Sequence, residues 1–173
     1  VSVFPNFCPS LFVMSGQVQR VSWKAKLPVT LYISSSVPME YRETMRIAAA
    51  QWNYKMNKVA FIIQDSDLIA ANPTKDNTSA IYWRTSWDDE HRNEQARTTI
   101  HWRGDQITEA DMSINAEDNQ FTAFGELAPG KVDFTSLIVH ELGHVMGLQH
   151  IQGQESVMAP TLAQNIERSN PYE

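Results

Sequence analysis

The sequence predicts an α+β fold in a single domain. Three observations lead to it: five short β-rich segments, two longer segments with helical features, and the order in which they occur. One helical segment follows the first strand and the other follows the last. A chain of 173 residues can bury one hydrophobic core, and no internal repeat, low-complexity tract or linker divides it.

The first strand and the first helix are expected near the start of the domain. Residues 28–34 (PVTLYIS) alternate in polarity and are rich in β-formers, which predicts a strand. Pro38 suits the first turn of a helix, and we expect that helix over 38–56. The apolar residues that recur there at helical spacing are Met45, Ala48, Ala49 and Trp52. The helix is therefore amphipathic, with one buried face.

Four more strands and a second helix follow. The strands are predicted over 59–64, 80–84, 98–102 and 110–115. The main loops are predicted over 65–78 and 116–132. The second helix is expected to begin near Asp133, an N-cap residue, with Ser136 in its first turn.

Residues 140–160 read HELGHVMGLQHIQGQESVMAP and carry the chemical signal. His140 and His144 are four residues apart, so on a helix both imidazoles lie on one face. A continuing helix would carry His150 about 15 Å beyond His140 along the axis, so the helix must end first. Gly147 allows this end, because glycine adopts the left-handed conformation without a steric penalty.

Three neutral imidazoles with an open fourth position are typical of a catalytic zinc site. We therefore expect one catalytic Zn²⁺, bound by His140, His144 and His150. Glu141 lies roughly 100° around the helix from the first of these histidines, beside the ion, where it can act as a general base. The alternative is a core helix that carries histidines by chance. The additional match of the glycine and of the third histidine disfavours it.

This stretch resembles the metzincin metallopeptidases, in which a turn with a methionine follows the zinc motif. Met158 lies eight residues after His150, and Pro160 two further on, which is most similar to the matrixin branch. Astacin-like and serralysin-like relatives carry a tyrosine ligand two residues after the methionine, where this chain has the proline. Ile151 stands where matrixins usually have serine, so the resemblance is to a divergent bacterial-type member. Met158 is expected to pack beneath the site without taking part in the chemistry.

The resemblance implies the zincin-like fold: a twisted, mostly parallel five-stranded sheet with a backing helix and an active-site zinc helix. Residues 107–116 (ITEADMSINA) are similar to the strand before the zinc helix of bacterial relatives. The catalytic domain is expected over 23–173, after an N-terminal extension over 1–22 that is a candidate pro-segment remnant. A first residue Val1 suggests a removed leader, and a secreted, extracellular or periplasmic location is expected.

The function that the site and the resemblance imply is a zinc-dependent endopeptidase acting on extended protein or peptide substrates. The residues expected to contact substrate are Thr98, Thr99 and Ile100 on the edge strand and Val139, Pro160 and Leu162 in an apolar pocket. Two alternatives stay open. One is a zinc-containing module that only recognises a peptide or protein, and the other is a hydrolase of a non-peptide amide.

Composition and charge narrow the classes of binding partner that the sequence favours. A net charge of −6 without a basic cluster disfavours nucleic acid and anionic membranes. No apolar run approaches the roughly 20 residues that span a bilayer. A monomer is expected.

Two histidines and several aspartates remain. His91 is expected to be exposed, and His101 to have a cross-strand or rim role rather than to bind metal. Animal matrixins carry a second zinc and several calcium ions, but with three of five histidines assigned no second zinc site is predicted. Ca²⁺ binding is left open but no motif supports it, because aspartates scattered in loops are usually solvated. The aspartates concerned are Asp65, Asp67, Asp105, Asp111 and Asp118.

A single cysteine, Cys8, excludes an internal disulfide. Matrixin pro-segments carry a cysteine whose thiolate occupies the fourth zinc position, and Cys8 lies fifteen residues before Trp23, at a comparable distance. Its neighbours lack the arginine and glycine that normally surround such a cysteine, so a bystander thiol is favoured over a latency ligand. A latency role predicts that Cys8→Ser raises activity. Unchanged activity with zinc present would make the thiol a bystander.

Overall fold

A computed structural model of the chain describes residues 13–14, 17–18, 21–68, 70, 72–123, 128–150 and 157–159. Five residues discussed above lie outside these ranges: Val1, Cys8, Ile151, Pro160 and Leu162. The roles expected for them stay predictions.

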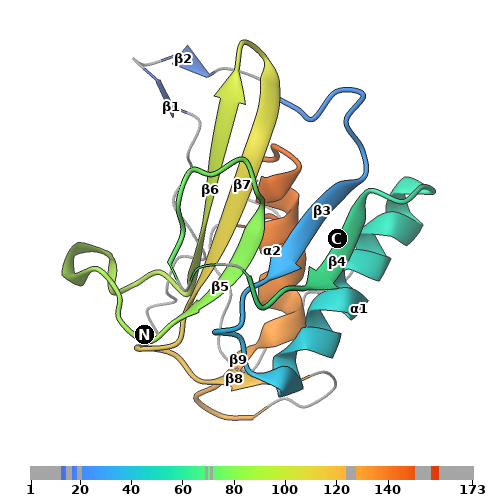
Figure 1. Cartoon of the computed structure of the whole chain (residues 1–173). Coiled ribbons are helices and arrows are strands. Elements are labelled where there is room, and N and C mark those ends of the chain that lie inside the picture. Colours follow the sequence, from blue (N-terminus) through green and yellow to red (C-terminus); the bar gives the residue numbers. More distant parts are fainter. Residues whose placement is uncertain are drawn as a thin grey trace.

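A five-stranded sheet forms the centre of the domain (Figure 1). Its strand order is β4 (Phe61–Asp65), β3 (Val29–Ile33), β5 (Ala80–Arg84), β7 (Gln106–Asn115) and β6 (Ala96–Arg103). The first four strands in this order are parallel, and β6 is an antiparallel edge strand. The predicted α+β fold with a mostly parallel sheet is confirmed.

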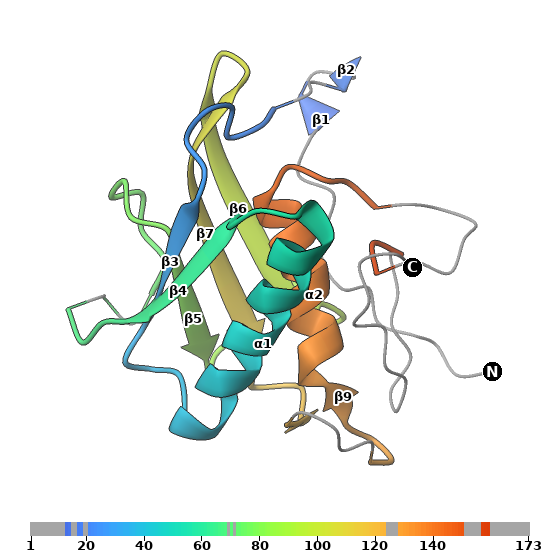
Figure 2. The same cartoon turned by 90° about the vertical axis from the view of Figure 1, so that its right-hand side faces the viewer.

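Two helices, α1 (Met39–Met56) and α2 (Phe134–Val145), lie side by side against one face of the sheet (Figure 2). α1 ends at Asn57, whose φ of 52° is left-handed, a conformation that asparagine tolerates better than most residues. Its buried residues include all four that the sequence predicted: Met45, Ala48, Ala49 and Trp52. In the described part of the chain, neither helix has the length and apolarity that a bilayer-spanning helix needs.

Several short elements were not predicted. The expected loop over 116–132 contains β8 (Phe121–Thr122) and the first residue of β9 (Val132–Asp133), and these two strands pair in parallel. The other unpredicted elements are β1 (Val13–Met14), β2 (Gln17–Val18) and the 3₁₀ helix η1 (Asp89–His91). Strands of two residues leave no alternation that a sequence could reveal. β7, the last of the five sheet strands in the sequence, also begins earlier than predicted. It starts at Gln106, because it pairs with β6 across a tight turn.

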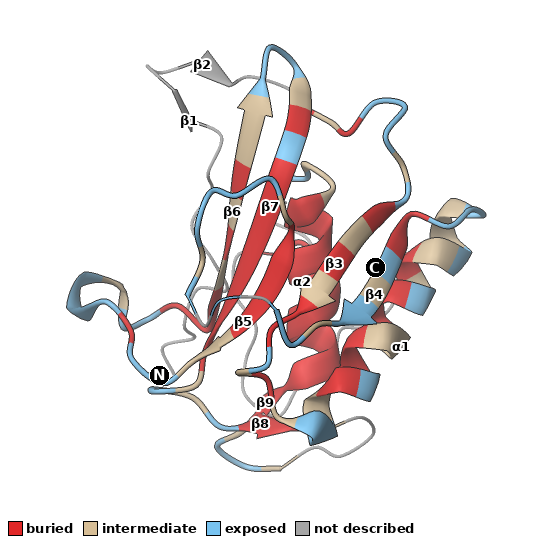
Figure 3. Cartoon of the chain, in the orientation of Figure 1, coloured by how far each residue is buried: buried red, intermediate tan, exposed pale blue. Residues whose placement is uncertain are grey.

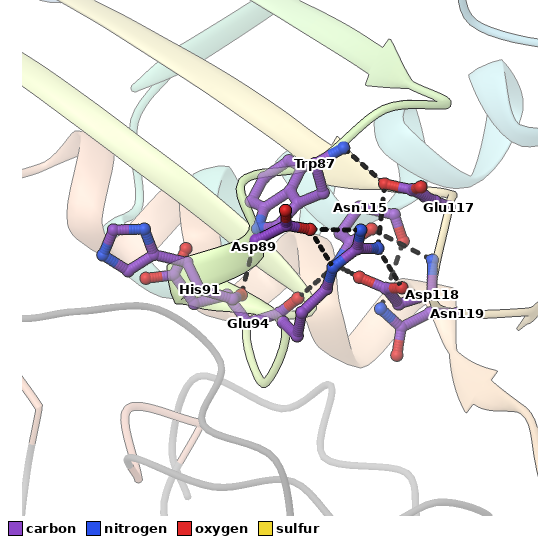
Figure 4. A network of polar contacts seen from close by, with 9 residues as sticks. Trp87, Asp89, His91, Glu94, Asn115, Glu117, Asp118 and Asn119 are labelled. Carbon is purple, nitrogen blue, oxygen red and sulfur yellow. Dashed lines mark hydrogen bonds and ion pairs between the residues drawn. The ribbon is translucent and has the colours of Figure 1, made fainter.

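A polar network joins the loop after β5 to the loop after β7 (Figure 4). The Arg92 guanidinium contacts Asp89 at 2.7 Å in its own loop, and Glu117 at 3.0 Å and Asp118 at 2.7 Å in the other. Asn115 then donates a hydrogen bond of 2.9 Å to Asp118. Each exposed pair contributes little alone, but together they hold the loop that leads into the edge strand.

β7 separates two environments and is buried along most of its length (Figure 3). Ala110, Met112 and Ile114 belong to the core on the helix side. The alternating residues Glu109 and Asp111 therefore face the opposite side of the sheet. There, backbone N–H groups of the loop between β4 and β5 donate to the Glu109 carboxylate, and the N–H of Ala80, the first residue of β5, donates to the Asp111 carboxylate.

Candidate metal centre

α2 begins where the sequence predicts, after the N-cap Asp133. The Asp133 carboxylate accepts hydrogen bonds from the Ser136 backbone N–H at 3.0 Å and from the Ser136 hydroxyl at 2.5 Å. Every residue of this helix is buried. The helix therefore carries its polar side chains into the interior of the domain.

The three histidines expected to bind zinc lie together. The ring centroids of His140 and His144 are 4.7 Å apart. The ring centroid of His150 lies 5.2 Å from that of His140 and 4.9 Å from that of His144. Each histidine offers a ring nitrogen within 4.8 Å of the other two. The arrangement fits three ligands of one cation.

Backbone carbonyls determine which ring nitrogens face the centre. Nδ1 of His140 donates to the Val157 carbonyl at 2.6 Å, and Nδ1 of His144 donates to the Leu148 carbonyl at 2.8 Å. A carbonyl can only accept, so Nδ1 carries the proton and Nε2 of each neutral ring carries a lone pair. The two Nε2 atoms are 3.0 Å apart. Two lone pairs at this separation suit a shared cation.

Burial keeps the three rings neutral. Burial, and then the charge of His144, lowers the pKa of His140 well below its usual value. Burial, and then the charge of His150, lowers the pKa of His144 to about 4. Burial also lowers the pKa of His150. Neutral imidazole is the form that binds metal at neutral pH.

Gly147 ends the helix, as the spacing predicts. Its φ is 97°, its N–H donates to the His144 carbonyl at 2.9 Å, and the Leu148 N–H donates to the Gly143 carbonyl at 3.0 Å. These two bonds form a Schellman motif. A Cβ at position 147 would also lie 2.5 Å from the Val21 carbonyl oxygen. Both the backbone conformation and the available space therefore require glycine where the chain turns toward His150.

Gly143 is a site residue that the sequence analysis did not single out. It lies between the two helical histidines, and a Cβ there would overlap the sulfur of Met158 and come within 3.0 Å of its methyl carbon. Met158 is buried and packs directly against the metal helix. A glycine inside a helix costs stability, so its presence was a signal of close packing.

Glu141 is fully buried and lies against the edge strand. Thr98 of β6 donates a hydrogen bond from its hydroxyl to the Glu141 carboxylate at 2.5 Å. The sequence placed both residues at the site, but it gave no indication that their side chains meet. The bond holds one oxygen of this carboxylate in place on the residue that follows His140.

Two tryptophans hold the metal helix in place. Trp52 of α1 donates its indole N–H to the Val139 carbonyl at 2.8 Å, and Trp23 donates to the Val145 carbonyl at 2.6 Å. Each bond joins the helix to a segment distant in sequence. The ligands on α2 therefore stand on a helix that is anchored near its middle and at its end.

The residues expected to contact substrate have different surroundings. Thr98 and Ile100 are buried on β6, and Thr99 between them is half-buried. Val139 has no exposed surface and belongs to the core. The pocket expected at Val139, Pro160 and Leu162 stays a prediction, since two of its residues lie outside the described ranges.

The remaining aspartates do not gather into one cation site. Asp65 is the ion-pair partner of Arg42 and Arg46, and Asp105 that of Lys24. Among the described residues, potential metal ligands group in two places. One is the histidine triad, and the other includes Asp111, which lies in a strand and not in a loop.

A comparison with protein families agrees with this geometry. The family model described as Matrixin matches residues 40–171, which is more than half of the chain. The chain belongs to the matrixin family. Membership in this peptidase family indicates zinc metalloprotease activity, and the triad fits the zinc that such activity requires. A search of curated proteins finds no match to this matrixin.

Proposed function

We propose that this matrixin is a zinc-dependent endopeptidase in which His140, His144 and His150 hold the zinc. The observation that carries the proposal is the convergence of three neutral imidazoles next to a buried glutamate. Bound zinc would supply a Lewis acid that acidifies water and polarises the scissile carbonyl.

The proton transfers fall to Glu141. Its carboxylate accepts a proton as water attacks the scissile carbonyl and then delivers it to the leaving amine. The hydroxyl of Thr98 donates to this carboxylate at 2.5 Å and restricts its rotation. The carbonyls of Val157 and Leu148 keep two of the imidazole rings turned toward the same centre.

Substrate is proposed to bind as an extended strand along β6. This strand ends the sheet order and pairs with β7 on one side only among the described strands. An edge strand recognises peptides through its backbone N–H and C=O groups. Thr98, Thr99 and Ile100 are the proposed positions of these contacts, and protein or peptide is the proposed substrate class.

The domain boundary and the location are part of the same proposal. Residues 23–173 form the catalytic domain, and 1–22 form an extension to it. Matrixins are typically extracellular, and we propose a secreted, extracellular or periplasmic location for this one.

Hydrolysis of a denatured protein, with and without a zinc chelator, tests the proposal. We expect cleavage that the chelator abolishes and added Zn²⁺ restores. Binding of the protein substrate without cleavage would indicate a recognition module instead. Hydrolysis of small non-peptide amides, with no cleavage of protein, would favour the other alternative.

A further inference from the structure

A surface cavity lies at the end of the sheet where strands β3 and β5 finish. These strands are parallel neighbours, so their carboxyl ends lie at the same end of the sheet (Figure 1). The cavity has a volume of about 320 Å³, which is within the range of small-molecule sites. Its lining comes from the turn after β3, from the β4–β5 loop and from the end of β5, and consists of Ser36, Asn72, Trp83, Arg84, Thr85 and Ser86. None of these residues belongs to the metal centre or to the proposed substrate strand.

The register of the sheet leaves room for this cavity. β3 ends at Ile33, which pairs with Ile81, whereas β5 continues to Arg84. The chain leaves β3 through α1 toward β4, and it leaves β5 toward β6 at the opposite edge of the sheet. Neighbouring parallel strands whose connections leave in opposite directions form a crevice, and open sheets commonly bind ligands in such a crevice. The topology therefore favours a ligand site where the cavity lies.

A chain of hydrogen bonds holds the cavity wall in place. The Trp83 backbone N–H donates to the Ser36 hydroxyl at 3.1 Å, and this hydroxyl donates to the Ser34 hydroxyl at 3.0 Å. The Ser34 hydroxyl donates in turn to the Ala70 carbonyl at 3.2 Å. These bonds join the end of β5, the turn after β3 and the β4–β5 loop. The wall is thus built by contacts within the domain and does not depend on a ligand.

Arg84 gives the cavity a positive charge. It is half-buried and is the single charged side chain among the described lining residues. In the part of the chain that the structure describes, Arg84 has no carboxylate partner, although the chain carries a net charge of −6. The other described arginines that are buried or half-buried all form ion pairs, namely Arg42, Arg46 and Arg97. An unpaired arginine at a cavity without a carboxylate points to an anionic ligand.

Trp87 positions the Arg84 guanidinium without using its hydrogen-bond donors. The guanidinium carbon lies over the Trp87 ring, 5.8 Å from the ring centroid. Trp87 is itself fixed, because its backbone N–H donates to Glu117 at 2.5 Å and its indole N–H donates to the His91 carbonyl at 3.1 Å (Figure 4). A cation–π contact draws on the charge of the guanidinium and not on its N–H groups. These planar, fork-shaped donors therefore suit a carboxylate.

Trp83 supplies an apolar wall beside this charge. Its ring stacks on that of Tyr41, with centroids 4.8 Å apart and ring planes at 21°. It is half-buried and also lines the cavity. An aromatic surface next to a guanidinium suits an organic acid, because the carboxylate can meet Arg84 while the carbon frame meets Trp83. Inorganic phosphate has no such frame.

We propose that this cavity binds a small organic acid, with Arg84 as the partner of its carboxylate. The hydroxyls of Thr85 and Ser86 belong to the same lining and would donate to the same group. The site lies outside the metal centre, so it gives the domain a second ligand site that does not require zinc.

The test is residue-resolved binding of benzoate, measured by NMR on zinc-loaded, isotope-labelled full-length protein. We expect saturable shifts at the backbone amides of Ser36, Thr85 and Ser86. Benzamide, which has nearly the same shape without the charge, should bind much more weakly. The shifts should persist after chelation of the zinc, because no described lining residue is a proposed zinc ligand. Shifts confined to the amides around the histidine triad, and lost on chelation, would show that benzoate binds only at the metal and would overturn the site.

Arg84→Gln should weaken benzoate binding roughly 10- to 100-fold, because it removes the charge and keeps a hydrogen-bonding side chain. Arg84→Lys, which keeps the charge without the planar fork, should lose less. Arg103→Gln is the matched control, since Arg103 is exposed at the end of β6. It removes the same charge elsewhere and should leave the affinity unchanged.

Four further results would contradict the proposal. Unchanged affinity in Arg84→Gln would remove the role of the guanidinium. Equal binding of benzamide would mean an apolar cavity that does not select anions. Tighter binding of inorganic phosphate would overturn the organic-acid assignment. Tighter binding of acetylated, amidated glutamate would assign the cavity to an acidic side chain of a protein instead of a free acid.

These measurements do not use peptide cleavage. A protein that binds benzoate through Arg84 but cleaves no peptide would refute the proposed function and not this site.

Discussion

At the scale of single residues, the contact between Thr98 and Glu141 holds in place the buried carboxylate to which we assign the proton transfers. Both side chains are almost fully buried, and their hydrogen bond is 2.5 Å long. A hydroxyl bonded to a carboxylate in a dry environment makes a stronger bond than it would in water. Thr98 therefore acts as a positioning residue in the proposed mechanism, in addition to its backbone role on the edge strand.

Replacing Thr98 with valine tests this role. Hydrogen bonds to charged groups contribute about 1.5–3 kcal/mol, so kcat/KM should fall by roughly 10- to 100-fold while bound zinc is unchanged. Thr98→Ser should restore most of the activity, because it restores the hydroxyl. Thr30→Val, at a half-buried position on β3 outside the proposed site, serves as the control. Wild-type cleavage by Thr98→Val would show that the hydroxyl does not position the glutamate.

Glu141→Ala should keep the fold and the zinc but lose cleavage. Loss of a general base typically costs about 10²–10⁴-fold, and a misplaced attacking water adds to this loss. Steady-state kinetics at neutral pH, together with zinc analysis, measure both properties. Near-normal activity in this variant would mean that another group takes the proton.

At the scale of elements, the metal centre depends on how α2 ends. The Schellman motif at Gly147 redirects the chain, and the Val21 carbonyl closes the space that a side chain would need. The helix end thus contacts the segment that precedes β3. A change at this one position disturbs the geometry of the third histidine.

Gly147→Ala should lower both the melting temperature and the zinc affinity. A left-handed alanine costs about 1–2 kcal/mol, and the clash with the Val21 carbonyl adds to this cost. Gly130→Ala is a matched control, since its φ is 75° but nothing lies within 4 Å of a Cβ there. Thermal unfolding of the two variants should show the larger loss for Gly147→Ala. Equal losses would mean that backbone conformation alone matters.

The same elements show what a sequence reveals and what it does not. The end of α2, its N-cap and the buried face of α1 follow local patterns, and these predictions are confirmed. The contact of Thr98 with Glu141 and the grouping of His101 with Glu109 arise from sheet register and from packing between distant segments. No local pattern encodes them.

At the scale of the whole molecule, bound zinc should stabilise the fold, because its ligands come from a helix and from the chain beyond it. A ligand at 100 times its dissociation constant contributes about 2.7 kcal/mol. For a domain of this size, chelation of one zinc should therefore lower the melting temperature by roughly 5–10 °C. Glu141→Ala should show the same shift, since it keeps the ligands. A chelator that removes the zinc without changing the melting temperature would contradict this coupling.

The central claim is that one zinc ion sits among His140, His144 and His150. Anomalous diffraction at the zinc absorption edge, from crystals of the Glu141→Ala variant, locates the metal directly and does not depend on activity. We predict a peak about 2.0–2.1 Å from a ring nitrogen of each of the three histidines. Crystals that contain zinc but show no anomalous peak among these three rings would contradict the account.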